Sequence, residues 1–148
     1  MKFTIQHLLN SLAGILKAEY PTYPVYTSSN QQGTAFPCFF IFLMPSTISA
    51  QPDERFYRDL GIDIVFVQQR NIVNGNAEIQ AIQEFLDSSL EAFLYSDGES
   101  AARIHTYERE ASTEDEELHY KFHIRQRVSA PRAKNPMKEM EGSNVSIE

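Results

Sequence analysis

Apolar residues recur at helical spacing in two separate stretches of the chain, residues 4–19 and residues 76–94. Pro21 and Pro24 end the first stretch, because proline cannot continue the hydrogen-bond ladder of a helix. Gly98, which follows an aspartate, ends the second. The spacing therefore predicts two amphipathic helices, each with one apolar face that needs a partner.

The remaining apolar residues follow strand patterns. Residues 36–44 are apolar at both odd and even positions, which predicts a central strand with both faces covered. Residues 55–68 alternate, so one face should be buried and the other should begin in water. The predicted strands are 24–27, 36–44, 55–68, 102–111 and 117–130. The expected fold is a single α+β domain, with a mixed or antiparallel sheet packed against both helices.

Two boundaries follow from this pattern. The α+β domain is expected to cover residues 1–130. Residues 131–148 contain prolines, a glycine and polar residues without periodicity, which predicts a flexible C-terminal tail that contributes little to folding.

Charge suggests how the last two strands pair across their acidic loop. Placing Glu110 opposite His119 and Glu108 opposite Lys121 brings opposite charges together. This register would turn Tyr107 toward the core.

Composition limits the classes of function. The chain has 148 residues, a formal net charge of −7 and a single cysteine. The negative charge argues against a nucleic-acid binder, since clustered Lys and Arg supply most non-specific affinity, and no sequence-specific nucleic-acid partner is expected. One cysteine allows no internal disulfide, and no apolar run approaches the roughly 20 residues of a membrane span. A reducing, cytoplasmic compartment is expected, with no role for a membrane.

Few residues suggest chemistry. Cys38 lies in an apolar strand without a neighbouring base, which favours a buried core thiol over a nucleophile. His119 and His123 share a strand and would lie roughly 13 Å apart, too far to chelate one metal ion. Asp59 and Asp63 are spaced the same way, too wide for paired acid–base catalysis. No phosphate loop, nucleophile elbow or zinc motif is present, so we expect no enzyme activity, cofactor or metal.

The order of elements resembles a known family. A helix is followed by Tyr23-Pro24-Val25-Tyr26, then by Phe36-Pro37-Cys38-Phe39-Phe40-Ile41, an alternating strand, a second helix and a hairpin. Over about residues 1–128 this arrangement is similar to the tail terminators of tailed bacteriophages and prophages. The resemblance implies a virion structural protein, assembled in the host bacterial cytoplasm. Six copies would form a ring on the head-proximal end of the tail tube, contacting the tube protein and a neck protein.

Other interpretations stay open at this point. Another neck or head-completion connector would have the same size and the same lack of chemistry. A small enzyme or ligand-binding domain would need a pocket between the second helix and the sheet, and a regulatory adaptor would need a host partner.

A mixed-charge stretch before and within the third predicted strand is the best candidate for a subunit or tube interface. Tyrosine and arginine are favoured at such contacts, and both signs of charge occur there within a short span. The candidate residues are Asp53, Glu54, Arg55, Tyr57, Arg58, Asp59 and Asp63, together with the loop at 46–54.

Overall fold

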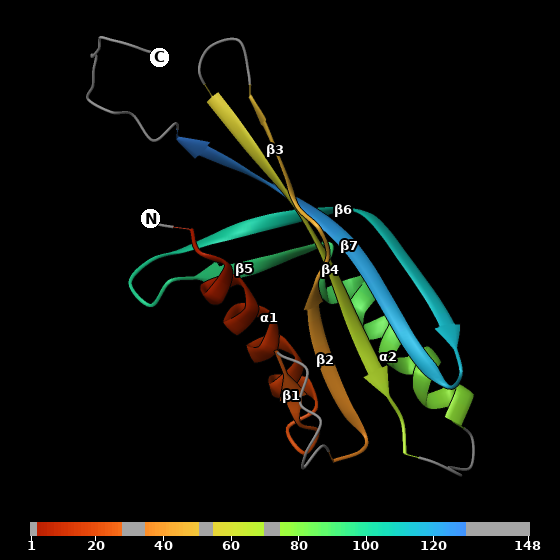
Figure 1. Ribbon diagram of the computed structural model, residues 1–148. Coiled ribbons are helices and arrows are strands. Elements are labelled where there is room, and N and C mark those ends of the chain that lie inside the picture. The colour runs from red at the N-terminus through yellow and green to blue at the C-terminus, as the bar shows by residue number, and fades with distance from the viewer. Residues whose placement is uncertain (1–2, 28–34, 51–54, 70–74, 130–148) are drawn as a thin grey trace, which may run out of the picture. The chain divides into compact units, whose positions relative to one another are not determined.

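The computed structural model describes residues 3–27, 35–50, 55–69 and 75–129 (Figure 1). Two compact units are distinguished: the first combines Met1–Ser46 with Asp59–Arg125, and the second combines Thr47–Arg58 with Gln126–Glu148. The predicted tail at 131–148 lies outside the described residues, and its boundary stays a prediction. The elements are α1 (Ile5–Glu19), β1 (Val25–Tyr26), β2 (Cys38–Leu43), β3 (Thr47–Ala50), β4 (Arg55–Val67), α2 (Gly75–Ser89), β5 (Ala92–Ser96), β6 (Ala101–Glu114) and β7 (Glu117–Ser129).

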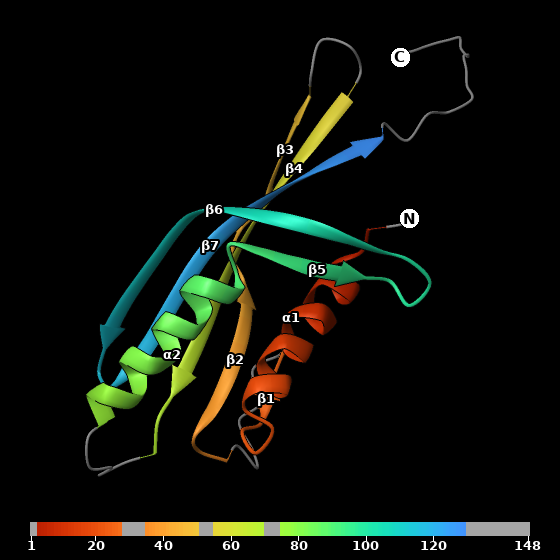
Figure 2. The ribbon, with the colours of Figure 1, turned by 180° about the vertical axis from the view of Figure 1, so that it is seen from behind.

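The α+β prediction is confirmed. The strands form one sheet in the order β1-β2-β4-β7-β6-β5, with β3 paired to β4. β1 runs parallel to β2, whereas β2 is antiparallel to β4 and β6 is antiparallel to β7. Figure 2 looks onto the side of the first unit that carries both helices. No described helix is long and apolar enough to cross a membrane.

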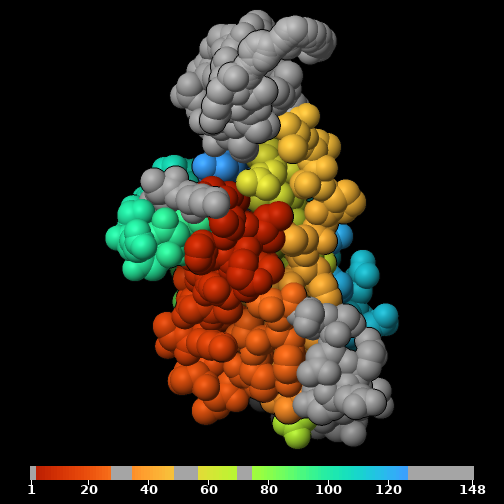
Figure 3. All heavy atoms as spheres, turned by 60° about the vertical axis from the view of Figure 1, so that its left-hand side comes forward, coloured from red at the N-terminus to blue at the C-terminus, as the bar shows by residue number. Residues whose placement is uncertain are grey.

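Helix α1 begins and ends as its sequence predicts. The Thr4 side chain accepts a hydrogen bond from the His7 backbone N–H at 3.1 Å, which caps the first turn. At the other end the Tyr20 N–H donates to the Leu16 carbonyl, and Pro21 follows. The buried face consists of Leu8, Leu9, Leu12 and Leu16. The rest of the helix forms much of the visible surface of the first unit in Figure 3, where it is red.

Helix α2 is shorter than its pattern predicts. It ends at Ser89, and residues 92–96 form strand β5 instead of a further helical turn. In β5, Phe93 and Tyr95 are buried while Leu94 between them is 58% exposed, which is the period of two that a strand requires. The turn at Gly98 (φ +93°) therefore closes the β5–β6 hairpin and does not end a helix.

Both helices pack against the same face of the sheet. The first unit has one apolar cluster, in which residues of α1 and α2 meet alternate residues of β2, β4, β5 and β7. On β4 the core residues are Leu60, Ile62, Ile64 and Phe66. Polar contacts fix α2 in addition: the Tyr120 hydroxyl on β7 donates to Asp87 Oδ1 at 2.7 Å. Burial, and then this hydrogen bond, raise the pKa of Tyr120 to about 12.

The prediction that β2 is covered on both faces is wrong for its far end. Phe42 is 37% exposed and Phe40 is only partly buried, because no helix covers the face toward which they point. A second element was missed altogether, since the segment at 47–50, expected as part of a connecting loop, forms β3 and pairs with β4.

The predicted register of the β6–β7 hairpin is also wrong. Glu110 lies opposite Lys121, and Tyr107 lies opposite His123, so Tyr107 faces away from the helices. Between these two pairs the register shifts at a β-bulge, where Glu108 has φ +52°. Charge pairing alone could not reveal this irregularity, because an extra residue moves every following side chain to the other face.

We expect Leu86→Ala to lower the free energy of unfolding by about 2–5 kcal/mol, since this side chain is fully buried between α2 and the sheet. Leu94→Ala is the matched control, because its side chain is largely exposed, and it should cost less than about 1 kcal/mol. Urea denaturation followed by circular dichroism measures both values. Equal losses in the two variants would show that α2 does not pack on this face.

Candidate functional site

The face of the first unit that carries no helix, here called the helix-free face, bears its polar side chains. On β4 the residues that alternate with the core positions are Asp59, Gly61, Asp63 and Val65, and they point toward this face. A Cβ atom at Gly61 would lie 2.8 Å from Met44 Cε and 3.3 Å from His123 Cε1. The missing side chain thus allows His123 of β7 to lie close over β4.

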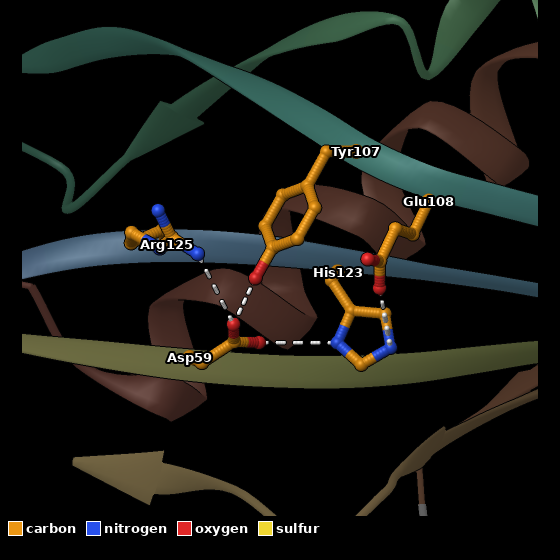
Figure 4. A network of polar contacts seen from close by, with 5 residues as sticks. All are labelled: Asp59, Tyr107, Glu108, His123 and Arg125. Atoms are coloured by element: carbon orange, nitrogen blue, oxygen red, sulfur yellow. Dashed lines mark hydrogen bonds and ion pairs between the residues drawn. The ribbon is translucent and has the colours of Figure 1, made fainter. Parts of the chain in front are cut away.

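The first polar group on this face is centred on Asp59 (Figure 4). Asp59 Oδ1 lies 3.0 Å from His123 Nδ1, and Asp59 Oδ2 accepts a hydrogen bond from the Tyr107 hydroxyl. The other ring nitrogen of His123, Nε2, lies 4.0 Å from Glu108 Oε1. The Arg125 guanidinium lies 3.9 Å from Asp59 Oδ2 and 5.2 Å from the centroid of the Tyr107 ring. The bulge in β6 carries both Tyr107 and Glu108, so it helps to build this group.

The second polar group repeats the arrangement at another point along the same strands, β4 and β7. Asp63 Oδ2 lies 3.1 Å from His119 Nδ1, and His119 Nε2 lies 3.6 Å from Glu117 Oε1. Asp63 is only 9% exposed, and its Oδ1 atom has no hydrogen-bond partner within the described residues. A buried carboxylate oxygen without a donor carries a desolvation cost.

Each histidine therefore lies between two carboxylates. In each group one ring nitrogen is at hydrogen-bond distance from an aspartate, and the other faces a glutamate at a longer distance. The four carboxylates, here called the acidic strip, are Asp59, Asp63, Glu108 and Glu117. Such a surface can bind cationic or hydrogen-bond-donating groups. Among the described residues, no cluster of His, Cys, Asp and Glu could hold a metal ion.

Aromatic side chains lie beside the acidic strip on the same face. Tyr26 of β1 pairs in register with Phe40 of β2, and their ring centroids are 5.3 Å apart. Phe40 stacks on Phe42 at 5.6 Å with an interplanar angle of 6°. Phe42 is paired across the strands with Asp63, which joins the aromatic residues to the strip. Aromatic residues next to charged ones are typical of protein–protein interfaces.

The structure divides the candidate interface residues between the two units. Tyr57 and Arg58 belong to the second unit and are partly buried, whereas Asp59 and Asp63 belong to the first. Asp53 and Glu54 lie outside the described residues, and of Arg55 only the backbone, in β4, is described. The contact role of the seven residues stays a prediction.

The structure brings Asp59 and Asp63 next to His123 and His119, a pairing that the sequence did not predict. Spacing along a strand places His119 and His123 too far apart to share one metal ion. It could not show that β4 lies beside β7, which places each aspartate next to one histidine. One signal in the sequence could have suggested this pairing. The two aspartates, Asp59 and Asp63, are four residues apart, and so are the two histidines, His119 and His123.

Cys38 is buried, as expected. Its side chain is fully shielded, and burial, followed by the charge of Glu117, raises the pKa of the thiol to about 11. A thiol of this kind is unsuited to nucleophilic chemistry near neutral pH.

Alkylation by iodoacetamide at pH 8 should be about 100-fold slower in the native protein than in urea, because a pKa near 11 instead of 9 leaves about a hundredth of the thiolate. The native rate should rise as pH increases toward 11. Mass spectrometry of quenched samples gives both rates. Similar rates in buffer and in urea would mean that the Cys38 strand is open to solvent.

Comparison with known families gives a match over most of the chain. The sequence profile of a family described as "Phage tail terminator protein" matches residues 7–136, which include most of α1 and every later element. A comparison with curated proteins found no match.

Proposed function

The chain belongs to the phage tail terminator family, and from this premise we propose that several copies close the head-proximal end of the tail tube as a ring. The family confirms the resemblance seen in the sequence and makes the chain a structural component of the phage tail. The ring would stop growth of the tube and present a surface to the neck of the particle. Six copies are proposed, with the tube protein and a neck protein as partners, assembled in the host cytoplasm.

The helix-free face is the observation that supports this proposal most directly. A subunit that contacts like subunits, a tube and a neck needs a broad surface with several kinds of chemistry. This face offers stacked aromatic rings beside two carboxylate–histidine groups. Its charged groups are held by neighbouring strands of the sheet, which reduces the entropy that they would lose on binding.

The subunit contact in a ring is heterologous, so each copy must present two different surfaces. We propose that one of them includes the polar stretch before and within β4, where both signs of charge occur. The residues are Asp53, Glu54, Arg55, Tyr57, Arg58, Asp59 and Asp63. The net charge of −7 supports the same arrangement, because an acidic ring repels DNA that passes through it.

Deleting the gene from the phage tests the role. We expect tails of uncontrolled length that fail to join heads, because nothing would stop addition of tube subunits. Negative-stain electron microscopy of lysates measures tail length and head attachment, and expression of the protein from a plasmid is the control. Tails of normal length on complete particles would exclude the terminator role.

Charge reversal tests the choice of surface. Arg58→Glu should weaken ring assembly without unfolding the subunit, since a reversed charge at a heterologous contact repels its former partner. Lys17→Glu, at an exposed position in the last turn of α1, is the control of equal charge change. Sedimentation velocity reports assembly and circular dichroism reports folding. If Arg58→Glu assembled as well as the control, this surface would not be a subunit contact.

A further inference from the structure

Charge is distributed unevenly along the chain. Residues 1–125 contain nine basic and 17 acidic residues, a net charge of −8. Residues 126–138 contain four basic residues and no acidic one, and residues 139–148 contain three acidic residues and no basic one. The basic residues of the middle stretch, here called the basic segment, are Arg127, Arg132, Lys134 and Lys138. A strongly acidic protein thus carries one compact run of positive charge, which needs an acidic partner.

The acidic strip has room for such a partner. A carboxylate has about four acceptor positions, and the histidines are at hydrogen-bond distance only from the two aspartates, not from Glu117 or Glu108. At one end of the strip the Glu117 side chain is 41% exposed, so its carboxylate is open to a donor from solvent. Glu108 is largely exposed, with 72% of its side chain accessible, so a long basic side chain can approach this end of the strip from solvent.

We propose that the basic segment of one copy binds the acidic strip of a neighbouring copy. This inference rests on the proposed ring, and it supplies the two unlike, complementary surfaces that a heterologous contact requires. Arginine and lysine side chains would donate to Glu117 and Glu108, whose exposed carboxylates lie beside the two histidines.

The length of the chain favours a neighbouring copy as the source of the segment. The strip begins at Glu117, the first residue of β7, and the basic segment lies at and beyond the end of that 13-residue strand. The strand covers roughly 40 Å of extended chain. The residues from 130 to 138 cover at most about 32 Å when fully extended. A segment that folded back along its own strand would therefore end before it reached Glu117, and it could not cover the full length of the strip.

The decisive measurement is whether variants of the basic segment and of the acidic strip weaken self-association independently of each other. The segment variant is Arg132→Gln with Lys134→Gln, and the strip variant is Glu108→Gln with Glu117→Gln. Each should weaken self-association about tenfold or more at 50 mM NaCl in sedimentation equilibrium, and the loss should shrink at 300 mM NaCl because salt screens charges. Combining the two variants should cost no more than either alone, because both remove the same contact.

The control variant, Lys17→Gln with Arg103→Gln, removes the same charge from exposed positions of the first unit and should leave self-association within about twofold of the wild type. Circular dichroism of all variants checks folding. The proposal would be overturned if the losses of self-association caused by the segment variant and the strip variant multiplied in the combined variant. It would also be overturned if the segment variant behaved like the control, or if the wild type stayed monomeric.

Two further outcomes distinguish failure of the segment contact from failure of the terminator role, and binding to the acidic strip from binding to DNA. If the segment variant self-associated normally and still restored tails of normal length to the deletion phage, the terminator role would stand and the segment contact would fall. If instead it lost binding to a 30-base-pair DNA duplex while its self-association was unchanged, phosphate groups and not the acidic strip would be the partner, which also contradicts the proposal.

Discussion

The burial of two helices against one face of a single sheet is the constraint on which the rest of the first unit depends. The leucines of α1 and the apolar face of α2 share one core with alternate residues of β4 and β7. Because both helices use the same face, the opposite face has no helix and must be stable while in contact with solvent or a partner. The His–Asp pairs between β4 and β7 fit that requirement, since they hydrogen-bond carboxylates that lie on an otherwise uncovered sheet.

Short-range sequence patterns predicted the elements that are determined by interactions between neighbouring residues. The first helix, its cap and most strands followed from spacing and from proline positions, because these signals lie within a few residues of one another. The end of α2 was misjudged because Phe93 and Leu94 continue a helical spacing by chance, whereas the burial of Phe93 and Tyr95 on one side shows a strand. The β6 bulge had no local signal, and it alone turns Tyr107 toward Asp59.

The polar site could not be predicted from the sequence, for a different reason. Asp59 and Asp63 lie 56 or more positions from the histidines that contact them, and only the order of strands in the sheet brings them together. A sequence read residue by residue suggested solvated carboxylates and ordinary histidines. The structure shows instead a repeated carboxylate–histidine–carboxylate arrangement, beside stacked aromatic rings, on the helix-free face.

The central claim is that this chain forms the last ring on the tail tube, and imaging that end of the tail tests it most directly. Single-particle electron microscopy of purified tails, aided by an antibody fragment against this chain, would locate it. We expect one closed ring at the head-proximal end, in which the helix-free face of each copy contacts a different surface of its neighbour. Antibody fragments distributed along the tube, or bound only at the opposite end, would contradict it.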